Sequence, residues 1–221
     1  MEANKDLNSS QSWRKLLRQY RAIAVIRTDN IQQGIDMAKA VAAGGMDIIE
    51  ITWNSYQPGE IIKQLKQDLP HCIIGTGTIL TLEELKEAIA AGIQFCFTPH
   101  VNQTLIKTAI NHDIPIIPGA LSPTEIITAW QAGASCVKVF PVQAIGGIAY
   151  IKGLQGPMGS IPLIPTGGVT LDNAAYFIEA GAIAVGLSSQ LFPRHALDDQ
   201  EWHIITQQAQ FLMQRLSEFQ Q

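Results

Sequence analysis

The sequence has 221 residues, of which 47% are hydrophobic and 15% are charged, and its formal net charge is −4. This composition predicts one domain over residues 1–221 with a large apolar core, and a loose polar tail over residues 1–10. It contains no basic block that would bind nucleic acid and no apolar run that could cross a membrane. The first ten residues lack the basic-then-apolar order of a signal peptide, so we expect a cytoplasmic protein.

Short β-rich runs alternate with amphipathic helical patterns along the chain. A first, extra helix is expected over Asn8–Tyr20, and a last helix over Asp199–Phe219. Eight strands are predicted between them, each leading toward a helical pattern. They are Ala22–Arg27, Asp47–Thr52, Cys72–Thr76, Gln94–Thr98, Ile114–Ile117, Cys136–Phe140, Ile161–Pro165 and Ala182–Gly186.

Several of the intervening helices carry start and stop signals. Capping signatures that predict helix starts occur at Thr81–Glu84, Asn102, Ser122–Glu125 and Thr170. Ala-Gly pairs that predict helix ends occur at 43–44, 91–92, 132–133 and 180–181. A glycine past a helix end is typical of a left-handed C-cap.

The Ala-Gly pairs also form a weak internal repeat. Their glycines are 48, 41 and 48 residues apart, so each interval has room for two strand–helix units. Eight such units predict a (β/α)8 TIM barrel, in the α/β class. The alternative is an open doubly wound sheet, but no G-x-G-x-x-G motif opens a helix after the first strand.

The cysteines and histidines show no ligand pattern. Cys72, Cys96 and Cys136 fall in separate apolar segments, which predicts buried, reduced thiols rather than a disulfide set or a zinc site. No two histidines have metal-ligand spacing, so we expect neither a metal nor a cofactor.

Lys138 is the most informative residue, because it lies in the apolar run Cys136–Phe140. Burial favours the neutral amine and lowers the pKa of a lysine. A neutral amine in an apolar pocket is a nucleophile for carbonyl groups, which indicates Schiff-base chemistry. The alternative is a lysine at a strand end whose ammonium group extends to solvent.

Glu50 is a second charged residue inside an apolar strand, Asp47–Thr52. It could form a salt bridge within the barrel, or it could act as a general acid/base with a pKa set by burial and by the lysine. An imine-forming lysine would favour the second interpretation, since carbinolamine and enamine steps require proton transfer.

Glycine-rich segments follow strands seven and eight, where barrel enzymes often hold a phosphate group. These segments are Thr166-Gly167-Gly168 and Gly186-Leu187-Ser188. Glycine allows the backbone to approach an anion closely, although tight turns use the same residues. Gly75–Thr78 could also bind an anion, with Thr78 as a hydroxyl donor to a carboxylate.

Together these motifs resemble those of the KDPG/KHG aldolases, the class I aldolases of 2-keto-3-deoxy-6-phosphogluconate and 4-hydroxy-2-oxoglutarate. The resemblance covers roughly Ala22 to Phe192. The motifs fall in the family's order: Glu50-x-Thr52, Gly75-x-Gly77-Thr78, Thr98-Pro99, Pro118-Gly119, Lys138-x-Phe140-Pro141, Thr166-Gly167-Gly168 and Gly186-x-Ser188.

The resemblance implies a metal-independent lyase, usually a homotrimer, that acts on a phosphorylated keto acid and yields pyruvate and an aldehyde. Lys138 would form the Schiff base, and Glu50 would be the general acid/base. Thr78, Pro99 and Phe140 would line the pyruvate end. The phosphate would be held by Thr166, Gly167, Gly168, Gly186, Leu187 and Ser188.

One position departs from the gluconate branch of the family. Asn54 stands where that branch has an arginine that helps to hold the pyruvate carboxylate, and Asn54-Ser55 is more similar to the 2-dehydro-3-deoxy-6-phosphogalactonate branch. His100 also departs from the Ser-Pro-Gly pattern of the gluconate branch. We expect Arg27, at the end of strand one, to supply the missing cation. The alternative for Arg27 is an ordinary surface cation.

Two other function classes compete with an aldolase. A phosphate-binding barrel isomerase or epimerase would need a second acid/base or a metal. A non-catalytic phospho-sugar binding protein would need neither Lys138 nor Glu50, so the embedded lysine discriminates between these interpretations.

Overall fold

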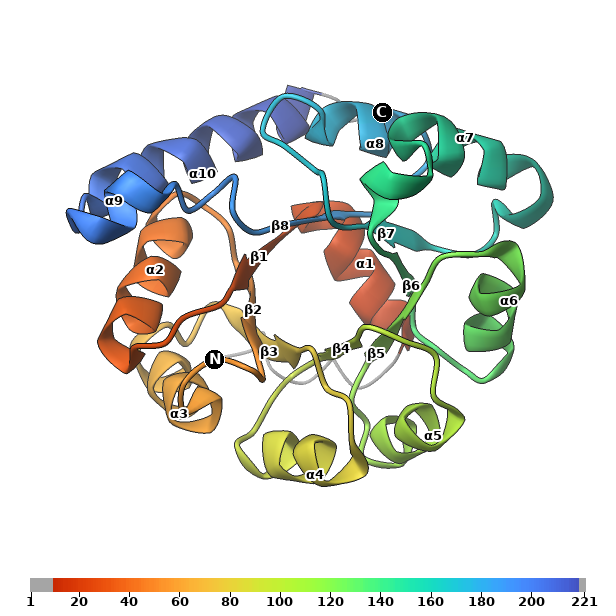
Figure 1. The fold of residues 1–221 in the computed structure, drawn as a ribbon, viewed down its shortest axis with the longest axis horizontal. Coiled ribbons are helices and arrows are strands. Elements are labelled where there is room, and N and C mark those ends of the chain that lie inside the picture. The colour runs from red at the N-terminus through yellow and green to blue at the C-terminus, as the bar shows by residue number, and fades with distance from the viewer. Residues whose placement is uncertain (1–9, 219–221) are drawn as a thin grey trace.

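A computed structural model describes residues 10–218 and shows a ring of eight parallel strands surrounded by helices (Figure 1). The strand order is β7-β6-β5-β4-β3-β2-β1-β8. The ring is nearly closed between β7 and β8, where a bridge joins Thr166 to Gly186 and Ile183 N donates to Leu163 O at 3.0 Å. The predicted (β/α)8 barrel is therefore confirmed, and the open doubly wound alternative is wrong.

All eight predicted strands are present, with shifted ends. They are β1 Ala22–Ile26, β2 Ile48–Thr52, β3 Ile73–Gly77, β4 Cys96–Thr98, β5 Ile116–Ala120, β6 Val137–Val139, β7 Leu163–Pro165 and β8 Val185–Leu187.

Helix α1 precedes the first strand, α9 and α10 follow the last one, and the other helices connect successive strands on the outside of the ring. The helices are α1 Ser10–Tyr20, α2 Ile31–Ala43, α3 Pro58–Asp68, α4 Leu82–Ala90, α5 Gln103–Asn111, α6 Pro123–Gln131, the 3-10 turn η1 Val142–Ile145, α7 Gly147–Met158, α8 Ala174–Glu179, α9 Arg194–Asp198 and α10 Trp202–Glu218. None of the helices within residues 10–218 is long and apolar enough to cross a membrane.

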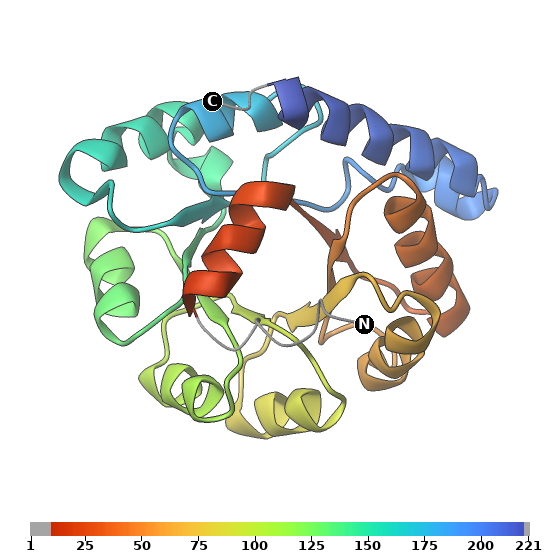
Figure 2. The same ribbon diagram turned by 180° about the vertical axis from the view of Figure 1, so that it is seen from behind.

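The apolar core has two parts. One lies between the strands and the surrounding helices. The other fills the barrel, where Phe95 stacks on Trp13 of α1 with ring centroids 5.0 Å apart and meets Phe97 edge-on at 5.8 Å. Helix α1 lies across one end of the barrel (Figure 2), and because it leads directly into β1, this is the end where the strands begin. The opposite end is left for a site.

The capping predictions are confirmed at three helices. Thr81 and Ser122 begin α4 and α6 with complete capping boxes, and Asn102 accepts hydrogen bonds from the first turn of α5. Thr170 is not an N-cap: it exchanges hydrogen bonds with Asn173 in a turn, and α8 begins only at Ala174.

The helix ends predicted from the four Ala-Gly pairs are confirmed, but the left-handed conformation is wrong at one of the four glycines. Gly44 has a φ of −85°, and Gly45 instead takes the left-handed conformation after α2 with a φ of +89°. The glycines at 92, 133 and 181 are left-handed as predicted.

Three further boundaries differ from the sequence-based prediction. β5 begins at Ile116, because Ile114 N donates to Ala109 O and so still belongs to the end of α5. β8 begins at Val185, because Ala182 N closes the end of α8 on Phe177 O. The last helix does not begin at Asp199, which caps the short α9; α10 begins at Trp202.

The chain ends fall partly outside the described residues. Of the expected loose tail over residues 1–10, only Ser10 is described, and it is the first residue of α1. Asn8 and Phe219, the outer limits predicted for the first and last helices, lie outside the described part.

Candidate active site

A cavity of about 270 Å³ opens at the carboxyl ends of the strands, as expected for a barrel of this type. It brings together most of the residues singled out in the sequence. These are Arg27, Glu50, Thr78, Pro99, Lys138, Phe140, Thr166, Gly167, Gly168, Gly186 and Ser188.

Lys138 is the middle residue of β6, where it pairs with Gly119 of β5 and Ile164 of β7. Its side chain is only 7% exposed, so its ammonium group does not extend to solvent. Its Nζ lies 4.6 Å from the centroid of the Phe140 ring and 5.9 Å from that of Phe97. The amine is therefore held in a largely apolar setting inside the barrel.

Glu50 is the middle residue of β2 and is 2% exposed. Its Oε1 is buried and has no hydrogen-bond partner within residues 10–218. A side-chain carbon at position 77 would overlap this oxygen, so only glycine leaves room for the carboxyl group beside β3. A buried carboxyl oxygen without a partner is costly, which is typical of a group kept for chemistry rather than for stability.

Burial shifts the pKa of each group in the direction that favours its neutral form. It raises the pKa of Glu50, an effect opposed by the positive charges of Lys138 and Arg27. It lowers the pKa of Lys138, which the negative charge of Glu50 opposes and the charge of Arg27 reinforces. None of the ion pairs within 4 Å among the described residues includes either group. The site can thus offer a neutral amine next to a proton-carrying carboxyl group.

The two glycine-rich loops meet on one side of the same cavity. Gly167 and Gly168 have φ angles of +79° and +97°, a conformation that side-chain-bearing residues rarely adopt. Val142 N donates to Thr166 O at 3.0 Å and Gln143 N to Gly167 O at 3.1 Å, which ties this loop to the turn after Lys138. The loop is therefore fixed relative to the lysine.

Two predicted residues lie outside the cavity. Leu187 is buried in the core between the strands and the helices, with 1% exposure, because side chains alternate along β8. Asn54 lies in a neighbouring cavity of about 570 Å³. Arg27 lines both cavities and is the residue that connects them.

The Asn54 loop is positioned by hydrogen bonds to the loop after β1. Ser55 Oγ accepts from Thr28 N at 3.2 Å and lies 3.1 Å from Thr52 Oγ1, and Tyr56 N donates to Thr28 O at 2.9 Å. These bonds tie the loop to the segment after β1, and Asn54 lines the neighbouring cavity but not the one that contains Lys138.

Four other residues line the cavity without having been assigned a role from the sequence: Val25, Thr52, Val169 and Ser189. Strand periodicity contained the signal for two of them. Val25 is two residues before Arg27 and Thr52 is two after Glu50, and alternate residues of a strand share a face. Nothing in the sequence distinguished the other two.

One group of side chains elsewhere could hold a metal ion. Ligand atoms of Asp47, His71 and Cys72 lie within 4.8 Å of one another at the beginnings of β2 and β3, at the end of the barrel remote from the cavity. Burial, with a smaller effect of Asp47, raises the pKa of the Cys72 thiol to about 12, which disfavours the thiolate that would bind a metal. All three cysteines are free and buried, as expected.

Residues 14–208 match the family model of the KDPG and KHG aldolases. The chain belongs to this aldolase family. A curated member, the 2-dehydro-3-deoxy-phosphogluconate aldolase of Dickeya dadantii (strain 3937), is 33% identical over 83% of this chain and 86% of that protein. The KHG/KDPG aldolase of Escherichia coli (strain K12) is 30% identical over 85% of this chain and 88% of its own length.

Solved structures of aldolases have the same fold. One, described as native KDPGal, is 32% identical with a TM-score of 0.82, and the match covers 89% of this chain and 94% of that one. Another is the KDPG aldolase from Legionella pneumophila with pyruvate captured as a covalent carbinolamine intermediate. It has 26% identity and a TM-score of 0.83 over 90% of this chain and 97% of that chain.

Proposed function

We propose that this chain is a class I aldolase that cleaves a 2-keto-3-deoxy-6-phospho sugar acid or 4-hydroxy-2-oxoglutarate to pyruvate and an aldehyde. The aldehyde would be glyceraldehyde 3-phosphate or glyoxylate. The observation that carries the proposal is the burial of Lys138 and Glu50 in one cavity. Burial lowers the pKa of Lys138 and raises the pKa of Glu50, and both shifts favour the neutral form of the group. The carbinolamine captured in the Legionella relative supports the same covalent route.

The neutral amine of Lys138 attacks the substrate ketone and forms a carbinolamine, which loses water to give a protonated imine. The imine accepts the electron pair of the breaking carbon–carbon bond, so the aldehyde leaves and an enamine remains. Protonation of the enamine carbon and addition of water then release pyruvate and regenerate the amine. Glu50 is the group placed to deliver and remove protons at these steps.

The rest of the cavity divides between the two ends of the substrate. Thr78, Pro99 and Phe140 would enclose the pyruvate portion, with Arg27 paired to the carboxylate. The loops at Thr166–Gly168 and Gly186–Ser188 would hold the phosphate. In this arrangement no metal is required, since the imine is the electron sink.

A galactonate-type substrate is the second candidate. The Asn54-Ser55 pair favours it, and the similar structure described as native KDPGal supports it. Initial rates of pyruvate release on gluconate-type, galactonate-type and unphosphorylated hydroxy-oxoglutarate substrates distinguish the candidates. If none of these substrates releases pyruvate, an isomerase or epimerase, or a non-catalytic phospho-sugar binding protein, would be favoured instead.

We also propose a cytoplasmic homotrimer. The family resemblance supports a trimer, and a similar chain forms part of a protein cage designed by fusing symmetric oligomeric domains. Light scattering coupled to size-exclusion chromatography measures the mass in solution, and a mass of one 24.1 kDa chain would contradict the trimer.

Borohydride trapping tests the central step. Pyruvate and borohydride together should add a reduced adduct to the peptide that contains Lys138, and activity should persist with a chelator present. Lys138→Met should abolish both the adduct and the turnover. Lys152→Met, which changes an exposed lysine of α7, is the matched control and should change neither. An adduct on another lysine would overturn the assignment.

A further inference from the structure

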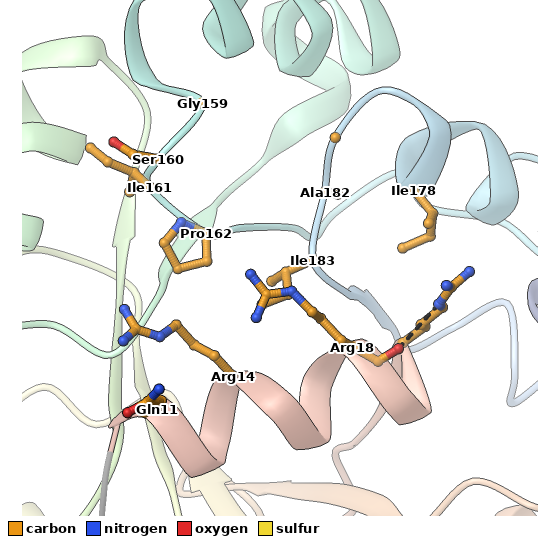
Figure 3. Close-up of a pocket in the computed structure, with 12 residues that line it drawn as sticks. Gln11, Arg14, Arg18, Gly159, Ser160, Ile161, Pro162, Ile178, Ala182 and Ile183 are labelled. Carbon is orange, nitrogen blue, oxygen red and sulfur yellow. Dashed lines mark hydrogen bonds between the residues drawn. The ribbon is translucent and has the colours of Figure 1, made fainter. Parts of the chain in front are cut away.

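A third cavity, of about 570 Å³, lies at the opposite end of the barrel from the candidate active site, and Figure 3 shows the residues that line it. It is formed between α1 and the segments that lead into β7 and β8. Its lining residues are Gln11, Arg14, Arg18, Arg21, Gly159, Ser160, Ile161, Pro162, Ile178, Gly181, Ala182 and Ile183. The two cavities share no lining residue, so this one is a separate feature of the fold.

The cavity is strongly cationic although the chain as a whole is acidic. Arg14, Arg18 and Arg21 line it, and they are half of the arginines in a sequence with a net charge of −4. No aspartate or glutamate is among the lining residues. None of the ion pairs between described residues includes Arg14 or Arg18. No carboxylate that lines the cavity therefore balances the charges of Arg14 and Arg18.

The three arginines are held by different contacts. The Arg14 guanidinium lies 5.6 Å from the ring centroid of Trp130, a cation–π contact that leaves its donors available. Arg21 Nε donates to Arg18 O at 3.2 Å and its Nη1 to Leu216 O at 3.3 Å, so Arg21 closes the ends of α1 and α10. The Arg18 side chain is exposed and, like that of Arg14, extends from α1 toward the Pro162 and Ile183 segments (Figure 3).

This arrangement costs stability unless an anion offsets it. Arg14 and Arg18 are spaced i, i+4 and so lie on one face of α1, and Arg21 follows directly after the helix ends at Tyr20. Like charges at such spacing destabilise a helix. Several planar guanidinium groups around one cavity match the multiple oxygens of a phosphate group, to which arginine donates two hydrogen bonds at once.

We propose that this cavity binds a small molecule that carries a phosphate or pyrophosphate group. Arg14 and Arg18 supply the charged donors, and Arg21 adds positive charge from a fixed position. The proposal is independent of the aldolase reaction, because the cavity lies at the other end of the strands and contains none of the proposed catalytic residues.

Pyrophosphate is the probe, titrated calorimetrically at low ionic strength because salt screens exposed charges. Arg18→Gln should weaken one class of pyrophosphate site by about tenfold or more, the loss expected for a charged hydrogen bond. Arg194→Gln removes the same charge from an arginine whose side chain is 95% exposed in α9, and it should leave binding unchanged. Equal affinity and stoichiometry in both variants and the unchanged protein would overturn the proposal.

A labelling experiment locates the site without any substitution. Phenylglyoxal modifies accessible arginines, and saturating pyrophosphate should protect Arg14 and Arg18 while leaving Arg194 reactive. Peptide mass spectrometry reads the extent of labelling at each position. Undiminished labelling of Arg18 under saturating pyrophosphate would refute the site, even if pyrophosphate binds in the catalytic cavity.

Discussion

The buried pair of Lys138 and Glu50 predicts that this protein gives up stability for activity. In the double variant Lys138→Met/Glu50→Gln, both ionisable groups are replaced by neutral side chains of similar size. Replacing buried charges in this way is commonly neutral or stabilising by about 1–4 kcal/mol. For a domain of this length, each kcal/mol raises Tm by about 2–4 °C. We therefore expect a higher Tm together with complete loss of turnover.

The gain should depend on pH in a defined way. Burial raises the pKa of Glu50 above its ordinary 4.5, so its stabilising contribution is complete below that value and is lost as pH rises through the folded-state pKa. Burial lowers the pKa of Lys138 below its ordinary 10.5, so its contribution is complete above that value and is lost as pH falls through the folded-state pKa. Only between these two ordinary pKa values do both groups lack their full stabilising contribution, so that each destabilises the folded protein. The advantage of the double variant should therefore be largest near neutral pH.

Urea unfolding at pH 4.5, 7 and 10 measures this difference. Each single variant should be less stable than the double one, because it leaves the other group buried without its opposite charge. Lys152→Met is the control for loss of a lysine and should be neutral. If the double variant is less stable than the unchanged protein at pH 7, the pair is a net stabilising ion pair within the barrel, and the reasoning from desolvation is wrong.

Four further predictions concern individual residues of the proposed reaction. Glu50→Gln should lower kcat by about 10²-fold or more, as for loss of a general acid/base, and a near-normal kcat would show that Glu50 is only structural. Gly167→Val should block the cavity beside Phe140 and impair phosphorylated substrates more than unphosphorylated ones; equal losses would indicate distortion of the barrel. Arg27→Ala should raise KM for pyruvate in the condensation direction by about tenfold or more. Asn54→Arg should shift the preference between gluconate-type and galactonate-type substrates. Unchanged values in both variants would contradict the assignment of Arg27 and Asn54.

The fold was predictable because each strand–helix unit carries its own signals. The capping boxes at Thr81 and Ser122 and the runs of apolar residues depend on neighbours close in sequence. The boundaries that failed depend on local competition that the pattern does not resolve. Ile114 is apolar and could continue a strand, but its backbone N–H is used by the end of α5.

The site was predictable to the extent that strand order determines proximity. Lys138 and Glu50 are 88 positions apart, yet both had to project at the carboxyl end of a barrel once eight units were counted. Their shared burial required the structure, because it depends on close packing. Gly77, for example, leaves the space that the Glu50 carboxyl occupies. The cationic cavity under α1 was not anticipated, since the segments that line it join only in three dimensions.

The position of Asn54 could not be predicted by matching sequence motifs alone. Asn54 stands four positions after Glu50, where the gluconate branch has an arginine, but Asn54 lines the neighbouring cavity, and Ser55 ties its loop to Thr28. Arg27 borders both spaces, and among residues 10–218 it is the only cation lining either of them besides Lys138. A carboxylate held by Arg27 would therefore lie at the border of the two cavities. On this geometry, a change at Asn54 acts on the substrate through Arg27, so the effect of Asn54→Arg should largely disappear when Arg27 is already alanine.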